Sequence, residues 1–259
     1  QEIRTGLLKL AHADNGDYTT VLMQGSGTFG VESVLSGVIS STDKVLVLQN
    51  GAYSKRMVEM CDYHGIKYVV YEEDYAHVPD PAIVEDVLKS DGNITHISMV
   101  HSETTSGLLN DIADIGELAK KYNKKFIVDA MSSFGGVDIN VPELGITYLV
   151  SSANKCIQGV PGFSFIIAKV NDLKQTKGIA RSLSLDYAQW ETMEKDGGKW
   201  RFTSPTHVVA AFSQALKELA AEGGITARNA RYTATNRALR KGMEELGFKA
   251  YIDKAHQGP

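Results

Sequence analysis

Short apolar runs rich in β-branched residues alternate along the chain with longer stretches in which apolar positions recur every three or four residues. This alternation is typical of an α/β protein in which a mostly parallel sheet lies between helices on both faces. Seven of the short runs are predicted to be strands of one sheet: 18–24, 45–49, 67–71, 95–100, 125–129, 147–151 and 163–168.

The segments between these runs indicate how the strands are connected. Asp80, Pro81 and Gly92 mark one crossover helix as its cap, its first residue and its stop. The last two strands are joined only by a turn rich in Ser, Asn, Gly and Pro, so this pair is expected to be antiparallel. Residues 181–206 are predicted to be mostly loop. Two long helical patterns follow, at 207–222 and 226–246.

The composition narrows the class of protein and of partner. Of the 259 residues, 43% are hydrophobic and 22% are charged, as in ordinary soluble globular proteins. A net charge of -4 with scattered Lys and Arg argues against a nucleic-acid partner. No apolar stretch reaches the roughly 18 residues that span a bilayer, so we expect a cytoplasmic protein without membrane contact. Cys61 and Cys156 lie far apart, which predicts neither a disulfide framework nor a metal site.

The stretch "QGSGTFG" at 24–30 contains G-x-G-x-x-G after an apolar run and before a helical pattern. A dinucleotide site also needs an acidic residue about 20 positions later, to hold the ribose hydroxyls. Gln49 and Asn50 end the second predicted strand instead. The sequence therefore argues against a nicotinamide or flavin site in this loop.

The same loop can still hold a phosphate group. It joins a strand to a helix N-terminus, where free N–H groups and the helix dipole face an anion, and Ser26 and Thr28 add hydroxyl donors. The alternative is a tight turn whose glycines only allow the helix and the strand to pack closely.

Three further strand ends carry polar residues that could reach such a ligand. Asp129 directly follows a buried run, and Lys155 lies in the turn between the last two strands, where burial would make its amine a nucleophile. Glu103, Thr104 and Thr105 follow the fourth strand. Alone, each could be a cap, a turn or a solvated side chain. Together, a phosphate cradle, an acid for a ring nitrogen and a buried lysine favour pyridoxal phosphate (PLP).

Several of these motifs occur together in one known family. The segments "QGSGTF", "NGAY", "HSETTSG", "VDAMSSFGG", "SSANKCIQGVPGF" and "GGKWRFTSPTH" resemble the 2-aminoethylphosphonate–pyruvate transaminases. These belong to the fold-type I PLP enzymes, beside the alanine–glyoxylate and serine aminotransferases. The resemblance runs from about residue 18 to the end of the chain.

The resemblance implies a role for each matching residue. Lys155 is then the Schiff-base lysine and Asp129 the partner of the pyridine nitrogen, and both are catalytic. The other implied cofactor contacts are the phosphate ligands Ser26, Gly27 and Thr28, the stacking ring of Tyr53, Thr104 at the phenolic oxygen, and Asn154 beside the lysine. Family members are homodimers with shared active sites, so Thr203 or Ser204 is expected to reach the partner subunit's phosphate. No metal is implied.

The implied reaction converts 2-aminoethylphosphonate and pyruvate to phosphonoacetaldehyde and alanine. By the same resemblance, residues 1–230 form the PLP-binding large domain and 231–259 begin a C-terminal small domain that is mostly absent. Both chain ends look like cuts, and the arginine that grips the substrate's acid group is expected in the missing part. Open alternatives are an alanine/serine–glyoxylate aminotransferase, a PLP-binding protein without catalysis, and a nicotinamide oxidoreductase.

Overall fold

The computed structural model describes residues 1–187 and 189–259, and its centre is a seven-stranded sheet with the order β1-β9-β8-β7-β4-β2-β3. Strand β9 is antiparallel to both of its neighbours, and the other pairs are parallel. The predicted fold class and the antiparallel last pair are confirmed. The strands are β1 (Tyr18–Gln24), β2 (Lys44–Gln49), β3 (Lys67–Glu72), β4 (His96–Val100), β7 (Lys125–Asp129), β8 (Tyr148–Ser152) and β9 (Phe163–Lys169).

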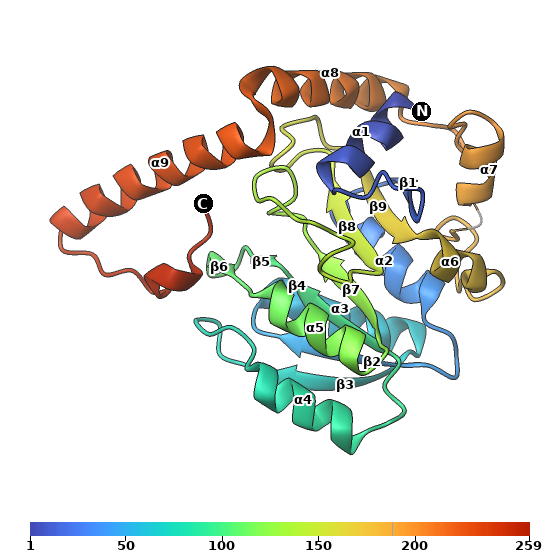
Figure 1. Cartoon of the computed structure of the whole chain (residues 1–259), viewed down its shortest axis with the longest axis horizontal. Coiled ribbons are helices and arrows are strands. Elements are labelled where there is room, and N and C mark those ends of the chain that lie inside the picture. Colours follow the sequence, from blue (N-terminus) through green and yellow to red (C-terminus); the bar gives the residue numbers. More distant parts are fainter. Residues whose placement is uncertain (188) are drawn as a thin grey trace.

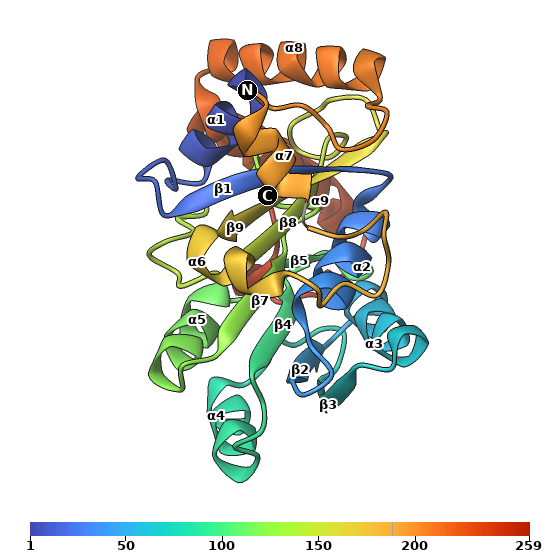
Figure 2. The ribbon, with the colours of Figure 1, turned by 90° about the vertical axis from the view of Figure 1, so that its right-hand side faces the viewer.

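Helices cover both faces of this sheet. Figure 2 shows α2 and α3 on one side of the strands and α4 and α5 on the other. Because the strands are enclosed, six of them are buried along all or nearly all of their length, whereas the edge strand β3 is exposed at both ends. The covering helices are α2 (Gly27–Val38), α3 (Ala52–His64), α4 (Pro81–Ser90) and α5 (Ile112–Lys121).

Short polar side chains set the starts of the two helices α4 and α5. The carboxylate of Asp80 accepts a hydrogen bond from the N–H of Ala82 at 2.8 Å, and Pro81 is the first helical residue. Asp111 caps α5 in the same way. Each cap satisfies an N–H group that has no partner inside its helix. The predicted cap and first residue of the crossover helix are confirmed.

The remaining elements lie at the ends of the chain and in the connections. Helix α9 extends away from the body of the molecule (Figure 1), and its buried residues are Ile225 and Arg228. The helix is continuous through residues 230 and 231, and the division into two domains there stays a prediction. These elements are α1 (Glu2–Leu10), β5 (Ser102–Glu103), β6 (Leu108–Leu109), α6 (Val170–Leu173), η1 (Lys174–Thr176), α7 (Gln189–Lys195), α8 (Thr206–Glu222), α9 (Gly224–Glu245) and η2 (Lys254–His256).

One local expectation is corrected. Segment 181–206 contains the helix α7, whose Met193 is buried and whose Glu194 pairs with Arg4. These contacts come from the other end of the chain, so the local pattern did not reveal them. Beyond the predicted fourth strand, the motif "HSETTSG" supplies β5 and the turn of a small hairpin that β6 completes. Among the described residues, no helix is both long enough and apolar enough to cross a membrane.

Candidate active site

The turns that follow β1, β2, β4, β7 and β8 line one cavity of about 250 Å³ at the carboxyl edge of the sheet. Parallel strands bring their carboxyl ends to one edge, so residues far apart in sequence meet there. The structure brings eight of the predicted site residues together in the wall of this cavity: Ser26, Gly27, Thr28, Tyr53, Thr104, Asp129, Asn154 and Lys155.

The glycine loop leads from β1 into the N-terminus of α2. Gly25 has a φ of +101°, a conformation that glycine adopts without strain, and its N–H donates to the carbonyl of Gly162. Ser26 is the N-cap residue, but its side chain makes no capping hydrogen bond. The N-terminus of α2 lies in the cavity wall with Ser26, Gly27 and Thr28, and its first turn has no capping side chain, so its positive dipole end is available to an anion.

The other two glycines of the motif are explained by close packing. A Cβ atom at Gly27 would come within 2.5 Å of the Met131 Sδ atom. One at Gly30 would come within 2.7 Å of the Ser164 hydroxyl on β9. The alternative role of the glycines, close packing of helix on sheet, thus holds for Gly30. It is compatible with an anion site at Ser26, Gly27 and Thr28.

The residues that replace the ribose-binding acid have structural partners. The side-chain amide of Gln49 donates to Glu72 at 3.1 Å. Asn50 donates to Asn110 at 2.7 Å and to the carbonyl of His77 at 3.0 Å. These side chains tie neighbouring connections together, which agrees with the argument against a nicotinamide site.

Asp129 ends β7 and is only 4% exposed. Its Oδ1 atom accepts a hydrogen bond from the N–H of Met131 at 2.9 Å. Burial raises the pKa of Asp129 to about 7, and the negative charge of Glu103 adds to the rise, while the Met131 N–H, Lys155 and Arg56 oppose it. A cationic group at this position would stabilise the carboxylate form. The structure thus places a buried acid where a protonated ring nitrogen could be held.

Lys155 lies in the turn after β8 and lines the cavity, but it is exposed. The expectation that this lysine is buried is wrong, because the turn lies at the open mouth of the cavity beyond the strand ends. Within residues 1–187 and 189–259, no carboxylate lies within ion-pair distance of its amine. Lys155 is therefore free to react with a carbonyl group in the cavity.

Tyr53 is held at the cavity by a buried acid that the sequence did not single out for this role. The fully buried carboxylate of Glu103 accepts from the N–H groups of Tyr53 at 3.3 Å and Ser54 at 3.2 Å, at the N-terminus of α3. Thr105 donates to the same carboxylate at 2.8 Å. A Cβ atom at Gly51 would overlap the Glu103 side chain, so glycine is required there. Glu103 and Thr105 therefore support the wall of the cavity from behind.

Arg56 also lines the cavity and was missed from the sequence. Its guanidinium lies 4.9 Å from the centre of the Tyr53 ring, and it donates to the Thr28 hydroxyl at 3.4 Å. The signal that could have revealed it is helical spacing, because residues three apart share a face of a helix. Arg56 adds positive charge beside the glycine loop.

Of the remaining predicted site residues, two lie at the cavity and two lie outside its wall. Thr104 exchanges a hydrogen bond with Ser132 at 2.7 Å, and Asn154 accepts one from Ser152 at 3.0 Å, both at the cavity. Thr203 and Ser204 are not in the wall of this cavity. Their expected contact with a partner subunit's phosphate is a proposal.

The groups around the cavity fit pyridoxal phosphate. The uncapped N-terminus of α2 with Arg56 suits a phosphate, the buried Asp129 suits a protonated ring nitrogen, and the unpaired Lys155 suits an aldehyde. A mostly parallel sheet with one antiparallel strand and this donor set at its carboxyl edge define the class: a fold-type I PLP-dependent transferase.

The comparisons with known proteins agree with this class. The family model described as Aminotransferase class-V matches residues 1–258, and the chain belongs to this family. It is 55% identical over 260 residues to the 2-aminoethylphosphonate–pyruvate transaminase of Klebsiella pneumoniae subsp. pneumoniae, covering 100% of this chain and 71% of the relative.

Two further matches concern a fused relative and a solved structure. The chain is 54% identical over 260 residues to the bifunctional phosphonoacetaldehyde hydrolase/aminoethylphosphonate transaminase of Clostridioides difficile, covering 100% of this chain and 41% of that protein. The alanine–glyoxylate aminotransferase of Nostoc sp. matches with a TM-score of 0.91 at 22% identity, covering 100% of this chain and 68% of that one. At this identity the structural match shows the fold alone.

Proposed function

We propose that this chain binds pyridoxal phosphate and transfers the amino group of 2-aminoethylphosphonate to pyruvate, giving phosphonoacetaldehyde and alanine. The observation that carries the proposal is the meeting of Lys155, Asp129 and the α2 N-terminus in one cavity. The substrate follows from the name of the Klebsiella relative at 55% identity. The Clostridioides relative, whose name joins the transaminase to a phosphonoacetaldehyde hydrolase, supports phosphonoacetaldehyde as the product.

When bound, pyridoxal phosphate supplies an electron sink for bond cleavage at the carbon that carries the amino group. In the first half of the reaction the Lys155 Nζ atom would take a proton from that carbon of 2-aminoethylphosphonate and pass it to the cofactor. In the second half it would deliver a proton to the carbonyl carbon of pyruvate, which becomes the α-carbon of alanine. Asp129 keeps a proton on the ring nitrogen, which its burial and its lack of an ion pair within the described chain favour. Tyr53 would stack on one face of the pyridine ring, Thr104 would contact the cofactor's phenolic oxygen, and Asn154 would lie beside Lys155.

The phosphate of the cofactor is assigned to Ser26, Gly27 and Thr28, with Arg56 close enough to offset its charge. Thr203 or Ser204 would complete this subsite from the other subunit of a homodimer. The homodimer with shared sites and a cytoplasmic location are parts of the proposal. An exposed Lys155 is consistent with them, since a partner subunit could cover the cavity mouth.

The test begins with purified chain and added pyridoxal phosphate. We expect a yellow protein whose absorption is bleached by borohydride in the unmodified chain and absent in Lys155→Ala. Stopped-flow mixing with 2-aminoethylphosphonate should remove the yellow absorption at least about tenfold faster than serine does. Faster conversion by serine would support the glyoxylate-type aminotransferase instead. A yellow protein that no amine converts would be a binding protein without catalysis.

The shared site has a separate test by subunit mixing. Lys155→Ala and a double change of Thr203 and Ser204 to Ala each inactivate the parent dimers if the loop serves the partner. In a two-fold dimer, a mixed pair then has one site with both defects and one with neither. Mixing should restore part of the activity. Verified subunit exchange with activity at the parental background would assign the loop to its own subunit.

A further inference from the structure

The first turns of α9 lie against both turns that carry the reactive residues. Arg228 is only 2% exposed, although it is charged and far from Lys155 in sequence. Its Nη1 atom donates to the carbonyl of Cys156 at 2.8 Å and to that of Ile157 at 3.2 Å. These carbonyls belong to the two residues that directly follow Lys155.

The turns after β7 and β8 are packed into one unit beneath α9. A Cβ atom at Gly135 would overlap the Ile157 side chain, and one at Gly136 would come within 2.9 Å of the Cys156 Sγ atom. The carbonyl of Gly136 accepts a hydrogen bond from Asn229 at 2.7 Å. Adjacent residues of α9 therefore hold the turn of Lys155 and the turn that follows Asp129.

We infer that Arg228 is a positioning residue for Lys155. The Arg228 guanidinium fixes the backbone of the turn, and this backbone aims the Lys155 amine into the cavity. This inference rests on the proposed function of Lys155. A planar guanidinium offers several donors in a fixed geometry, and here it satisfies two backbone carbonyls and Glu222 at once. Without it, both carbonyls lose a buried partner and the turn can relax.

The chain offers a matched control in Arg4. Arg4 is 3% exposed, and it too donates to two backbone carbonyls, those of Thr20 and Met193, and pairs with a glutamate. If Arg228 is replaced, its partner Glu222 still pairs with Arg231. If Arg4 is replaced, its partner Glu194 still accepts a hydrogen bond from Thr19. Arg4 lies at β1 and α7 and not in the wall of the Lys155 cavity. A purely structural role predicts the same behaviour for both arginines.

The experiment compares Arg228→Met with Arg4→Met in the 259-residue chain at a temperature where thermal unfolding shows both to be folded. The first readout is the rate at which cofactor-free protein becomes yellow after mixing with pyridoxal phosphate. We expect Arg228→Met to be slower by about tenfold or more, and Arg4→Met to stay within about twofold of the unmodified chain. Arg228→Lys, which keeps the positive charge and a donor group but loses the planar fork, should recover part of the rate.

The second readout needs no cofactor. Acylation of Lys155 by a reactive ester, followed by peptide mass spectrometry, should change in Arg228→Met and not in Arg4→Met. Equal behaviour of the two variants in both readouts would overturn the inference. If Arg228→Met does not fold, Arg228→Lys compared with Arg4→Lys carries the same test, because both arginines donate to two backbone carbonyls.

The two readouts also separate this inference from the proposed function. A chain that never becomes yellow would refute the cofactor assignment, while the acylation data would still report on Arg228. A chain that becomes yellow at the same rate in all variants, with unchanged acylation of Lys155, would refute only the role of Arg228.

Discussion

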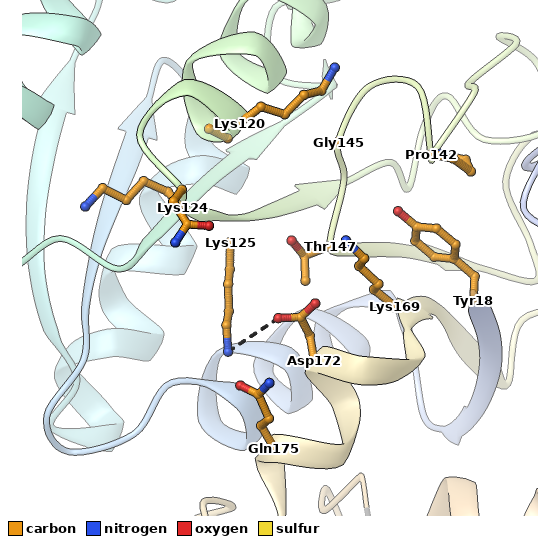
Figure 3. Close-up of a pocket in the computed structure, with 12 residues that line it drawn as sticks. Tyr18, Lys120, Lys124, Lys125, Pro142, Gly145, Thr147, Lys169, Asp172 and Gln175 are labelled. Atoms are coloured by element: carbon orange, nitrogen blue, oxygen red, sulfur yellow. Dashed lines mark ion pairs between the residues drawn. The ribbon is translucent and has the colours of Figure 1, made fainter.

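At the amino ends of the parallel strands, a cavity of about 550 Å³ has four lysines in its wall, whereas the cavity at the carboxyl ends measures about 250 Å³ and has one. The amino-end lysines are Lys120, Lys124, Lys125 and Lys169, and the amino groups of the first three point in different directions (Figure 3). A larger cavity with more positive charge therefore lies at the end where no reactive set was predicted.

The partners of these lysines explain the difference. The Lys120 amine donates to Glu117 at 2.5 Å and to the carbonyl of Glu143 at 2.6 Å, and Lys124 donates to the carbonyl of Ile94 at 2.5 Å. Lys125 lies 3.7 Å from Asp172 (Figure 3). Helix α5 ends here, and lysines near a helix C-terminus are stabilised by its dipole. Three of these lysines thus have structural partners of their own.

The charged residues at the carboxyl ends of the strands differ from these lysines in their pairing. Lys155 and Arg56 have no carboxylate within ion-pair distance in the described parts of the chain, and Asp129 is buried without a cation bound to it. Two helices, α2 and α3, begin there, so their dipoles favour anions. The candidate site therefore differs from the amino-end cavity because charged groups without ion-pair partners meet there. The volume of the cavity and the number of its charges do not identify the site.

Removing one lysine from each end gives the largest expected contrast. Lys155→Ala should lower transamination by on the order of a thousandfold or more and abolish the borohydride-sensitive absorption, because the group that moves the proton is lost. Lys125→Ala should leave both unchanged. Steady-state rates and absorption spectra of the two variants decide. Comparable losses in both would show that the amino-end cavity takes part in the reaction.

The acid of the candidate site is tested by Asp129→Asn. An amide cannot keep the ring nitrogen protonated, so we expect the rate to fall by on the order of a hundredfold to a thousandfold while pyridoxal phosphate still binds. Single-turnover kinetics with 2-aminoethylphosphonate, together with a cofactor titration, separate rate from binding. A near-normal rate would assign Asp129 to packing of the β7 turn.

The raised pKa of Asp129 predicts that Asp129→Asn also changes how the stability of the cofactor-free chain depends on pH. Asp129 has a pKa of about 7 in the folded chain against an ordinary value of 3.8, so the folded state keeps its proton more tightly than the unfolded state. The cofactor-free chain should therefore lose stability between about pH 4 and pH 7, by up to several kcal/mol. Asp129→Asn lacks this loss.

Denaturant unfolding of both proteins at several pH values measures the effect. The free energy of unfolding of Asp129→Asn minus that of the unmodified chain should increase from about pH 4 to about pH 7 and then level off. Taking the difference cancels the contributions of His96 and His101, whose pKa values burial lowers to about 4. A difference that does not depend on pH would contradict the raised pKa of Asp129.

Much of the fold could be predicted because its signals are local. Buried parallel strands are continuous apolar runs, and Asp80 with Pro81 marks a helix start by short-range geometry. Asp129 could be found for the same reason, since it directly follows an apolar run, and Lys155 because it lies in the turn after the next such run. Both positions are at the edge that parallel strand ends share.

The missed features depend on contacts between distant segments. Helix α7 is held by Arg4, Glu103 serves the N-terminus of α3, and Arg228 binds the turn of Lys155. No local pattern distinguishes these charged residues from solvated ones. The exposure of Lys155 was also missed, because a turn between two buried strands can still lie at an open cavity mouth.

The smallest expected effect concerns Gly30, the last glycine of the motif, and tests whether this glycine supports cofactor binding as well as packing. Gly30 lies under the cradle in α2, and Gly116 lies in α5 near the amino-end cavity, where a Cβ atom would overlap the carbonyl of Leu144. Both Gly30→Ala and Gly116→Ala should destabilise the fold by about 1–3 kcal/mol through overpacking. Only Gly30→Ala should also weaken pyridoxal phosphate binding, by roughly tenfold, which corresponds to about 1.4 kcal/mol.

Thermal unfolding and a fluorescence titration with pyridoxal phosphate measure the two effects separately. The reason for the expected split is that an added methyl at Gly30 meets Ser164 and Val150 and must lift the N-terminus of α2, which lies in the cavity wall. Gly116 has no such link. Unchanged affinity in a destabilised Gly30→Ala would leave the glycine with packing as its whole role, and the cradle would then depend on Ser26, Gly27 and Thr28 alone.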